Sequence, residues 1–213
     1  MNPYQASKRT EKICRLAPVI PVLVVQNPET ARPLAEALIS GGLPVLEITL
    51  RTKSALQVIS EMAKVPGAVV GAGTITKSND IKDAINAGAS FAVSPGVTDT
   101  ILEESERHNL AIMPGASTPS EIMRLLEFGY SVQKFFPAEA NGGRAALKAI
   151  AGPLPNVKFC ATGGINCDNA GGYLELENTL CVGGSWVATQ KLIENKDWRT
   201  IHDLAKKASV LVS

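Results

Sequence analysis

The chain of 213 residues is 45% apolar and 19% charged, with a formal net charge of +1. Such a balanced composition offers no basic surface for nucleic acid and no acidic tail for a basic partner, so we expect neither kind of interaction. No apolar run approaches the roughly 20 residues that span a bilayer, and the N-terminal segment lacks the apolar core of a secretory signal. We therefore expect a cytoplasmic protein that does not interact with membranes.

Short apolar runs alternate along the chain with amphipathic stretches. Eight of these runs are nearly continuous in apolar residues, which is typical of parallel strands buried on both faces. The predicted strands are Val19–Val25, Pro44–Leu50, Ala68–Gly73, Phe91–Pro95, Ala111–Gly115, Val132–Pro137, Val157–Thr162 and Leu180–Gly183.

The intervening stretches carry the start and stop signals of helices. Helices are predicted from Asn27-Pro28 to Gly41-Gly42, from Ser78 to Gly88, and from Ser117 to Gly129. The segment before the first strand predicts an extra helix across the bottom of a barrel, and Asp197–Val212 predicts the last outer helix. Eight strand–helix units without a flexible linker predict one domain, residues 1–213, folded as an α/β (β/α)8 TIM barrel. An open doubly wound sheet is the alternative.

The cysteines and histidines favour no metal site. The four cysteines form no C-x-x-C pair, and the chain has only two histidines. We expect free thiols in a reducing compartment, and neither a metal ion nor a cofactor.

Two strands carry charged residues within otherwise apolar runs. In the second strand, Glu47, Thr49 and Arg51 alternate and so project from one face. If that face lines the barrel, Glu47 lies in the lumen and Arg51 at its rim. Lys134 lies in the middle of the sixth strand, where an ammonium group must be paired or give up its proton. A buried lysine near other cations can serve as an amine nucleophile with Glu47 shuttling protons; a purely structural Glu47–Lys134 ion pair is the alternative.

Glycine pairs follow the last two strands. Barrel phosphate sites are commonly built from these two loops, because bare backbone N–H groups there can point at an anion. The sequence therefore predicts a phosphate site formed by Gly163, Gly164, Gly184 and Ser185. Thr74 and Pro95 follow the third and fourth strands and are expected at the same rim.

Six segments, in this order and spacing, resemble the 2-dehydro-3-deoxy-6-phosphogluconate (KDPG) aldolase family. They are L-E-I-T-L-R-T (46–52), V-G-A-G-T (70–74), S-P-G (94–96), K-F-F-P-A-E (134–139), A-T-G-G-I (161–165) and V-G-G-S-W (182–186). The resemblance implies that Lys134 forms a Schiff base and that Glu47 is the general acid and base. It also implies that Arg51 and Thr74 hold the substrate carboxylate.

The resemblance further implies that Thr162 contacts a substrate hydroxyl and that the glycine pairs with Ser185 hold phosphate. Pro95 and Phe136 are likewise expected to contact the substrate. Family members often have proline where this chain has Ala161, a departure that bears on stereochemical strictness.

The implied reaction is a metal-independent class I aldol cleavage of KDPG to pyruvate and glyceraldehyde 3-phosphate, in the Entner–Doudoroff pathway. Cleavage of 4-hydroxy-2-oxoglutarate to pyruvate and glyoxylate is expected as well, and the family implies a homotrimer. The alternatives are an aldolase for the galactonate epimer of the substrate, and a barrel without covalent chemistry that isomerises or only binds a phosphosugar.

Overall fold

A computed structural model describes residues 1–211 of the chain. Its strands form one parallel sheet in the order β5-β4-β3-β2-β1-β9-β8-β7-β6. The strands are β1 (Val19–Leu23), β2 (Val45–Thr49), β3 (Val69–Gly73), β4 (Phe91–Val93), β5 (Ala111–Met113), β6 (Gly115–Ala116), β7 (Val132–Phe135), β8 (Lys158–Thr162) and β9 (Thr179–Gly184). Each of the eight predicted strands is present.

The nine segments make eight strands, because β5 and β6 are one strand interrupted at Pro114. Proline has no N–H to donate to the ladder, but the Pro114 carbonyl accepts a hydrogen bond from the Lys134 amide at 2.8 Å. β5 pairs with β4 and β6 pairs with β7, so the interrupted strand closes the ring. The predicted TIM barrel is therefore confirmed, and the open sheet is excluded.

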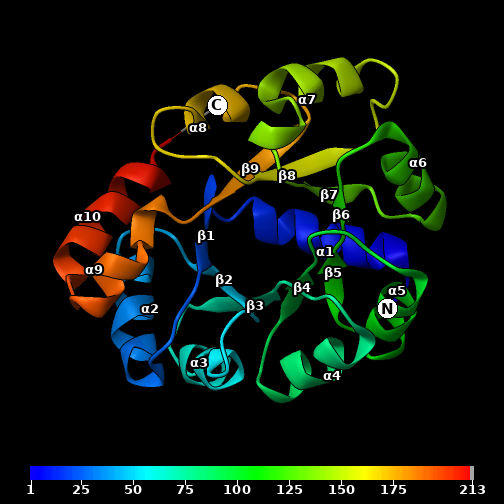
Figure 1. Ribbon diagram of the computed structural model, residues 1–213. Helices are drawn as coiled ribbons and strands as arrows, with labels where there is room; N and C mark the ends of the chain where they lie inside the picture. The colour runs from blue at the N-terminus through cyan, green and yellow to red at the C-terminus, as the bar shows by residue number, and fades with distance from the viewer. Residues whose placement is uncertain (212–213) are drawn as a thin grey trace.

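Helices surround the ring of strands (Figure 1). They are α2 (Ala31–Ser40), α3 (Ala55–Met62), α4 (Ser78–Asn86), α5 (Asp99–Arg107), α6 (Pro119–Phe128), α7 (Gly143–Ala151), α8 (Ala170–Leu174), α9 (Gln190–Glu194) and α10 (Trp198–Ser209), with the 3₁₀ turns η1 (Pro28–Thr30), η2 (Glu139–Asn141) and η3 (Trp186–Ala188). Asn27 caps η1 and Thr118 caps α6, as their positions in the sequence predict. The predicted end of the last helix, Val212, lies outside the described residues. No helix in the described part of the chain is both long and apolar enough to cross a membrane.

The predicted N-terminal helix is α1 (Pro3–Cys14), which begins with a capping box between Asn2 and Gln5. Its buried residues Ile13 and Cys14 join an apolar cluster with side chains from the barrel interior, among them Val45 and Phe91 near the start of their strands. α1 therefore closes the end of the barrel where the strands begin, and a substrate must enter from the end where they finish.

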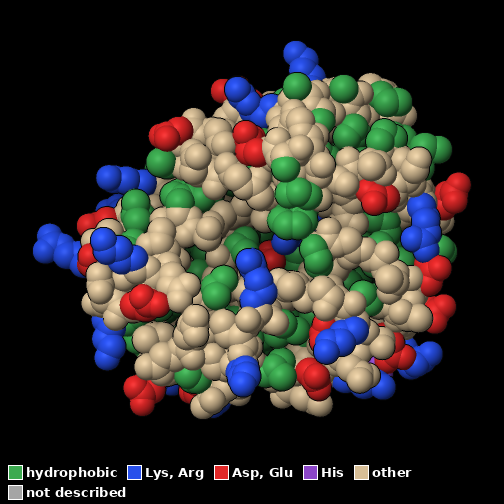
Figure 2. Space-filling view, in the orientation of Figure 1, with side chains coloured by type: hydrophobic (Ala, Val, Ile, Leu, Met, Phe, Trp, Pro, Cys, Tyr) green, Lys and Arg blue, Asp and Glu red, His purple; other side chains and the backbone are tan. Residues whose placement is uncertain are grey.

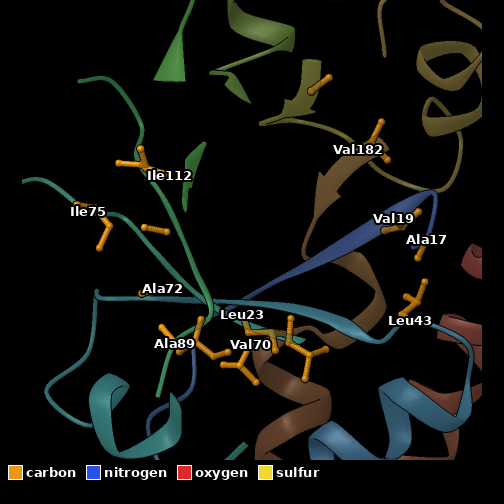
Figure 3. Packing of buried hydrophobic residues seen from close by; sticks show 14 of the residues in the cluster. Ala17, Val19, Leu23, Leu43, Val70, Ala72, Ile75, Ala89, Ile112 and Val182 are labelled. Carbon is orange, nitrogen blue, oxygen red and sulfur yellow. The ribbon is translucent and has the colours of Figure 1, made fainter. Parts of the chain in front are cut away.

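The other face of the strands packs against the helices. Val70 and Ala72 of β3 alternate with interior-facing glycines and belong to the larger apolar cluster, which also contains helix residues such as Leu34 and Leu38. Figure 3 shows Leu23, Val70 and Ala72 within this packing layer. The layer fixes the strands, so that charged side chains inside the barrel are held on rigid elements.

Candidate active site

Lys134 and Glu47 face each other across the diameter of the barrel. They lie on β7 and β2, which have three strands between them on either side of the ring. The Nζ atom of Lys134 is 3.2 Å from Oε1 of Glu47, and the two residues are 5% and 1% exposed. The structure thus brings together the two charged residues that the sequence placed in the lumen. Figure 2 shows basic and acidic side chains in the hollow at the middle of the molecule.

Glycines inside the barrel make room for this pair. A Cβ atom at Gly73 would overlap the Glu47 carboxylate, and one at Gly71 would overlap the ring of Phe91. Glycine within a strand often marks such close approach. Neither glycine is among the site residues that the sequence predicts, although two glycines in the short run V-V-G-A-G indicate a close approach of this kind.

One oxygen of the pair remains available for chemistry. Oε2 of Glu47 is buried and has no hydrogen-bond partner among the described residues. On the other side of the ammonium group, the Phe136 ring centroid is 5.2 Å from Nζ of Lys134. Phe136 is half-buried and precedes Pro137 through a cis peptide bond. A buried amine, an apolar ring and an unpaired carboxylate oxygen therefore meet at one point.

Buried thiols form the floor below the pair. Cys160 is the register partner of Lys134, and Cys14 and Cys181 are also buried. A hydrogen bond with Cys181 lowers the pKa of the Cys160 thiol, and the Lys134 charge acts in the same direction. Contacts with Cys14 and Cys160, with burial, raise the pKa of Cys181. Across residues 1–211, no three His, Cys, Asp or Glu side chains are grouped so that they could hold a metal ion.

Arg51 and Thr74 lie at neighbouring strand ends. Thr49 of β2 pairs with Gly73 of β3, so the residues that follow these strands share one part of the rim. Arg51 is exposed and makes no hydrogen bond or ion pair within residues 1–211. Thr74 has a φ of 62°, a left-handed conformation that is strained for a β-branched residue and that clusters at functional sites. Its position was predicted, whereas its backbone strain was not.

Pro95 packs against Gly115, which lies beside Lys134 on the neighbouring strand. Gly115 is the register partner of Lys134, and a Cβ atom there would overlap the backbone of Pro95. The S-P-G turn therefore packs directly over the strand beside Lys134. Pro95 itself is half-buried at the rim.

Thr162 and the two glycine pairs lie on adjacent strands. Thr162 pairs with Gly183, whose missing Cβ leaves space for the Thr162 hydroxyl. Gly163 and Gly164 follow with φ values of 106° and 78°. Their N–H groups, and that of Ser185, donate to no acceptor within the described residues. Gly184 differs, since it is the last residue of β9 and packs against the Trp186 ring.

The chain matches a known protein family over most of its length. The family model for KDPG and KHG aldolases matches residues 10–204. The chain belongs to this aldolase family. It is 50% identical to the 2-dehydro-3-deoxy-phosphogluconate aldolase of Pseudoalteromonas atlantica, over 90% of this chain and 89% of that protein. It is 47% identical to the KHG/KDPG aldolase of Escherichia coli over 93% of both chains.

Solved structures of KDPG aldolases agree with this assignment. The Legionella pneumophila KDPG aldolase, with pyruvate captured as a covalent carbinolamine, has a TM-score of 0.91 and 44% identity, covering 93% of this chain and 97% of that one. A 4-hydroxy-2-oxoglutarate/KDPG aldolase has a TM-score of 0.87 and 33% identity, covering all of both chains. The protein is thus a lyase of the KDPG aldolase family, and the predicted family resemblance is confirmed.

The buried ion pair makes a testable contribution to stability. Lys134→Met or Glu47→Gln should each lower the free energy of unfolding by about 3 kcal/mol, because the remaining polar group stays buried without its partner. The double variant should lose less than the sum, with a coupling of at least about 1 kcal/mol. Urea denaturation of all four proteins measures this cycle. Additive losses would show that the two side chains do not interact.

Proposed function

We propose that this protein cleaves KDPG to pyruvate and glyceraldehyde 3-phosphate through a Schiff base on Lys134. The observation that carries the proposal is the buried contact of 3.2 Å between Lys134 and Glu47 at the centre of the barrel. Lys134 is buried with a carboxylate in hydrogen-bond reach, and such burial is how proteins obtain an amine nucleophile.

The contact with Glu47 supports the first steps. Glu47 accepts a proton from the Lys134 ammonium, which frees the Nζ lone pair to attack the C2 ketone of the substrate. Glu47 then returns this proton to the carbinolamine hydroxyl, which leaves as water, so that the product is a protonated imine and Glu47 is again a carboxylate. Oε2 of Glu47, which has no partner among residues 1–211, is free to bond a water or substrate hydroxyl meanwhile.

Cleavage follows from the electron demand of this imine. Glu47 removes the proton of the C4 hydroxyl, directly or through a water, and the C3–C4 bond breaks. The electron pair moves into the imine and gives the enamine of pyruvate, while C4 leaves as the aldehyde of glyceraldehyde 3-phosphate. Protonation of the enamine at C3 and hydrolysis release pyruvate and free Lys134. The iminium supplies the electron sink that a metal ion supplies in other aldolases, so no metal or cofactor is needed.

The rim suits the two charged ends of the substrate. Arg51 and Thr74, at the adjacent ends of β2 and β3, are proposed to hold the carboxylate. The unused N–H groups of Gly163, Gly164 and Ser185, with Gly184, are proposed to hold the phosphate. Thr162 at the end of β8 and Phe136 beside Lys134, together with Pro95, are proposed to contact the sugar acid chain between these ends.

The relatives support overlapping substrates. The similar Escherichia coli protein bears both the KHG and KDPG names, so we propose that this protein also cleaves 4-hydroxy-2-oxoglutarate to pyruvate and glyoxylate. A solved structure named KDPGal shares only 24% identity with this chain at a TM-score of 0.76, which supports the fold alone. We therefore assign the gluconate substrate and a role in the Entner–Doudoroff pathway.

We also propose a cytoplasmic homotrimer. The four cysteines are free, which suits a reducing compartment. The trimer rests on the family resemblance, and α6 exposes Met123 and Phe128 as apolar side chains that an interface could cover. Light scattering on the purified protein should give three times the 22.5 kDa chain mass, and a mass equal to that of one chain would contradict the trimer.

Removal of Lys134 should abolish catalysis. Lys134→Ala should lower kcat for KDPG by at least about 1000-fold, because Lys134 is the only lysine that pairs with Glu47 among residues 1–211. Glu47→Gln should lower it about 100-fold or more through the loss of proton transfer. Pyruvate release coupled to NADH oxidation by lactate dehydrogenase measures both variants.

Lys158→Ala is the matched control. Lys158 begins β8 at the opposite end of the barrel, where its Nζ donates to the Glu177 carbonyl, so this variant should keep wild-type activity. Equal losses in Lys134→Ala and Lys158→Ala, or retained activity in Lys134→Ala, would refute the assignment.

A further inference from the structure

The Gly163–Gly164 turn is held against the loop that follows Lys134. The Ala138 amide donates to the Thr162 carbonyl at 2.8 Å, and the Glu139 amide donates to the Gly163 carbonyl at 3.0 Å. A Cβ atom at Gly164 would lie 2.7 Å from Cβ and Cγ of Glu139. Glu139 therefore packs its aliphatic stem directly on the turn that carries two of the proposed phosphate-binding amides.

The carboxylate of Glu139 points away from this turn. Its Oε1 atom accepts a hydrogen bond from the hydroxyl of Tyr173 on α8 and lies on the side of Gly143. Burial, together with the hydrogen bond to Glu139, raises the pKa of Tyr173 well above its usual range, so its hydroxyl stays a donor at neutral pH. Tyr173 is fully buried and therefore fixed in position.

The direction of the Glu139 carboxylate matters because the ligand proposed for this turn is an anion. A free Glu139 side chain could swing toward the Gly163–Gly164 turn and repel a phosphate there. The Tyr173 hydroxyl holds the charge on the far side, and the stem of Glu139 then supports the turn. On the opposite side, the Asn169 side chain donates to the Gly164 carbonyl at 3.2 Å.

We propose that Tyr173 and Glu139 are positioning residues that keep the Gly163–Gly164 turn competent for phosphate, and so set the preference for phosphorylated keto acids. The inference rests on the proposed aldolase function and on its phosphate site. It concerns only one end of the substrate, because neither side chain contacts Lys134 or Glu47 in the described structure. Substitution of Tyr173 or Glu139 should therefore weaken the binding of phosphorylated substrates and leave that of unphosphorylated ones unchanged.

Tyr173→Phe tests the inference. KM for KDPG should rise about tenfold, the change expected from one lost hydrogen bond to a charged group, with kcat within about twofold. The kcat/KM for 4-hydroxy-2-oxoglutarate, which has no phosphate, should stay within about twofold. A role in general stability would instead change the kinetics of both substrates together.

Tyr130→Phe is the matched control. It removes another buried tyrosine hydroxyl that bonds a glutamate, Glu106, at 3.4 Å, but it lies before β7 at the closed end of the barrel. This variant should leave both substrates unaffected. An equal rise of KM for KDPG in Tyr130→Phe would overturn the inference.

Glu139 provides a second test that does not depend on the folding of Tyr173→Phe. Glu139→Gln keeps an acceptor for the Tyr173 hydroxyl and should keep the wild-type KM for KDPG within about twofold. Glu139→Ala removes the stem and the acceptor, and should match Tyr173→Phe. An unchanged KM in both Tyr173→Phe and Glu139→Ala would overturn the inference while wild-type cleavage of KDPG still stands. Absence of KDPG cleavage by the wild type would instead refute the proposed function.

Discussion

The Glu47–Lys134 ion pair spans the barrel from β2 to β7. The strands and the apolar residues around this pair are arranged so that the two charges can remain buried. Removing both groups from water is costly, and only a close partner in good geometry offsets the cost. The barrel meets this condition with opposite strands that present the side chains 3.2 Å apart. Below them lie thiols and the apolar cluster sealed by α1, so water and substrate reach the pair only from the open end.

The space around the pair comes from missing side chains. Gly73 leaves room for the Glu47 carboxylate, Gly183 for the Thr162 hydroxyl, and Gly115 for the Pro95 backbone. Glycine weakens a strand, because it loses more conformational freedom and packs no side chain. Its repeated use inside this barrel therefore marks positions where the site requires volume. The strained φ of Thr74 is a further conformational cost, here at the rim of the site.

The strands of the barrel and the charged residues inside it could be predicted from the sequence. Buried parallel strands are continuous apolar runs, so the eight strands were visible, and a lysine or glutamate within such a run was conspicuous. The Lys134–Glu47 contact was predictable although the two residues are 87 positions apart, because each is a charged residue within a strand of the predicted barrel. The Tyr173–Glu139 hydrogen bond was not predicted, because it joins two residues outside the strands and Tyr173 belongs to a short helix of only five residues with no recognisable signal. Backbone strain at Thr74 leaves no trace in residue type.

The central claim is a covalent bond between Lys134 and the keto acid. Borohydride trapping with pyruvate tests this claim most directly. The protein is incubated with pyruvate, reduced, digested, and analysed by peptide mass spectrometry. We predict one reduced pyruvyl adduct, located on Lys134, and none in Lys134→Ala. An adduct on another lysine, or no adduct in folded protein that cleaves KDPG, would contradict the account.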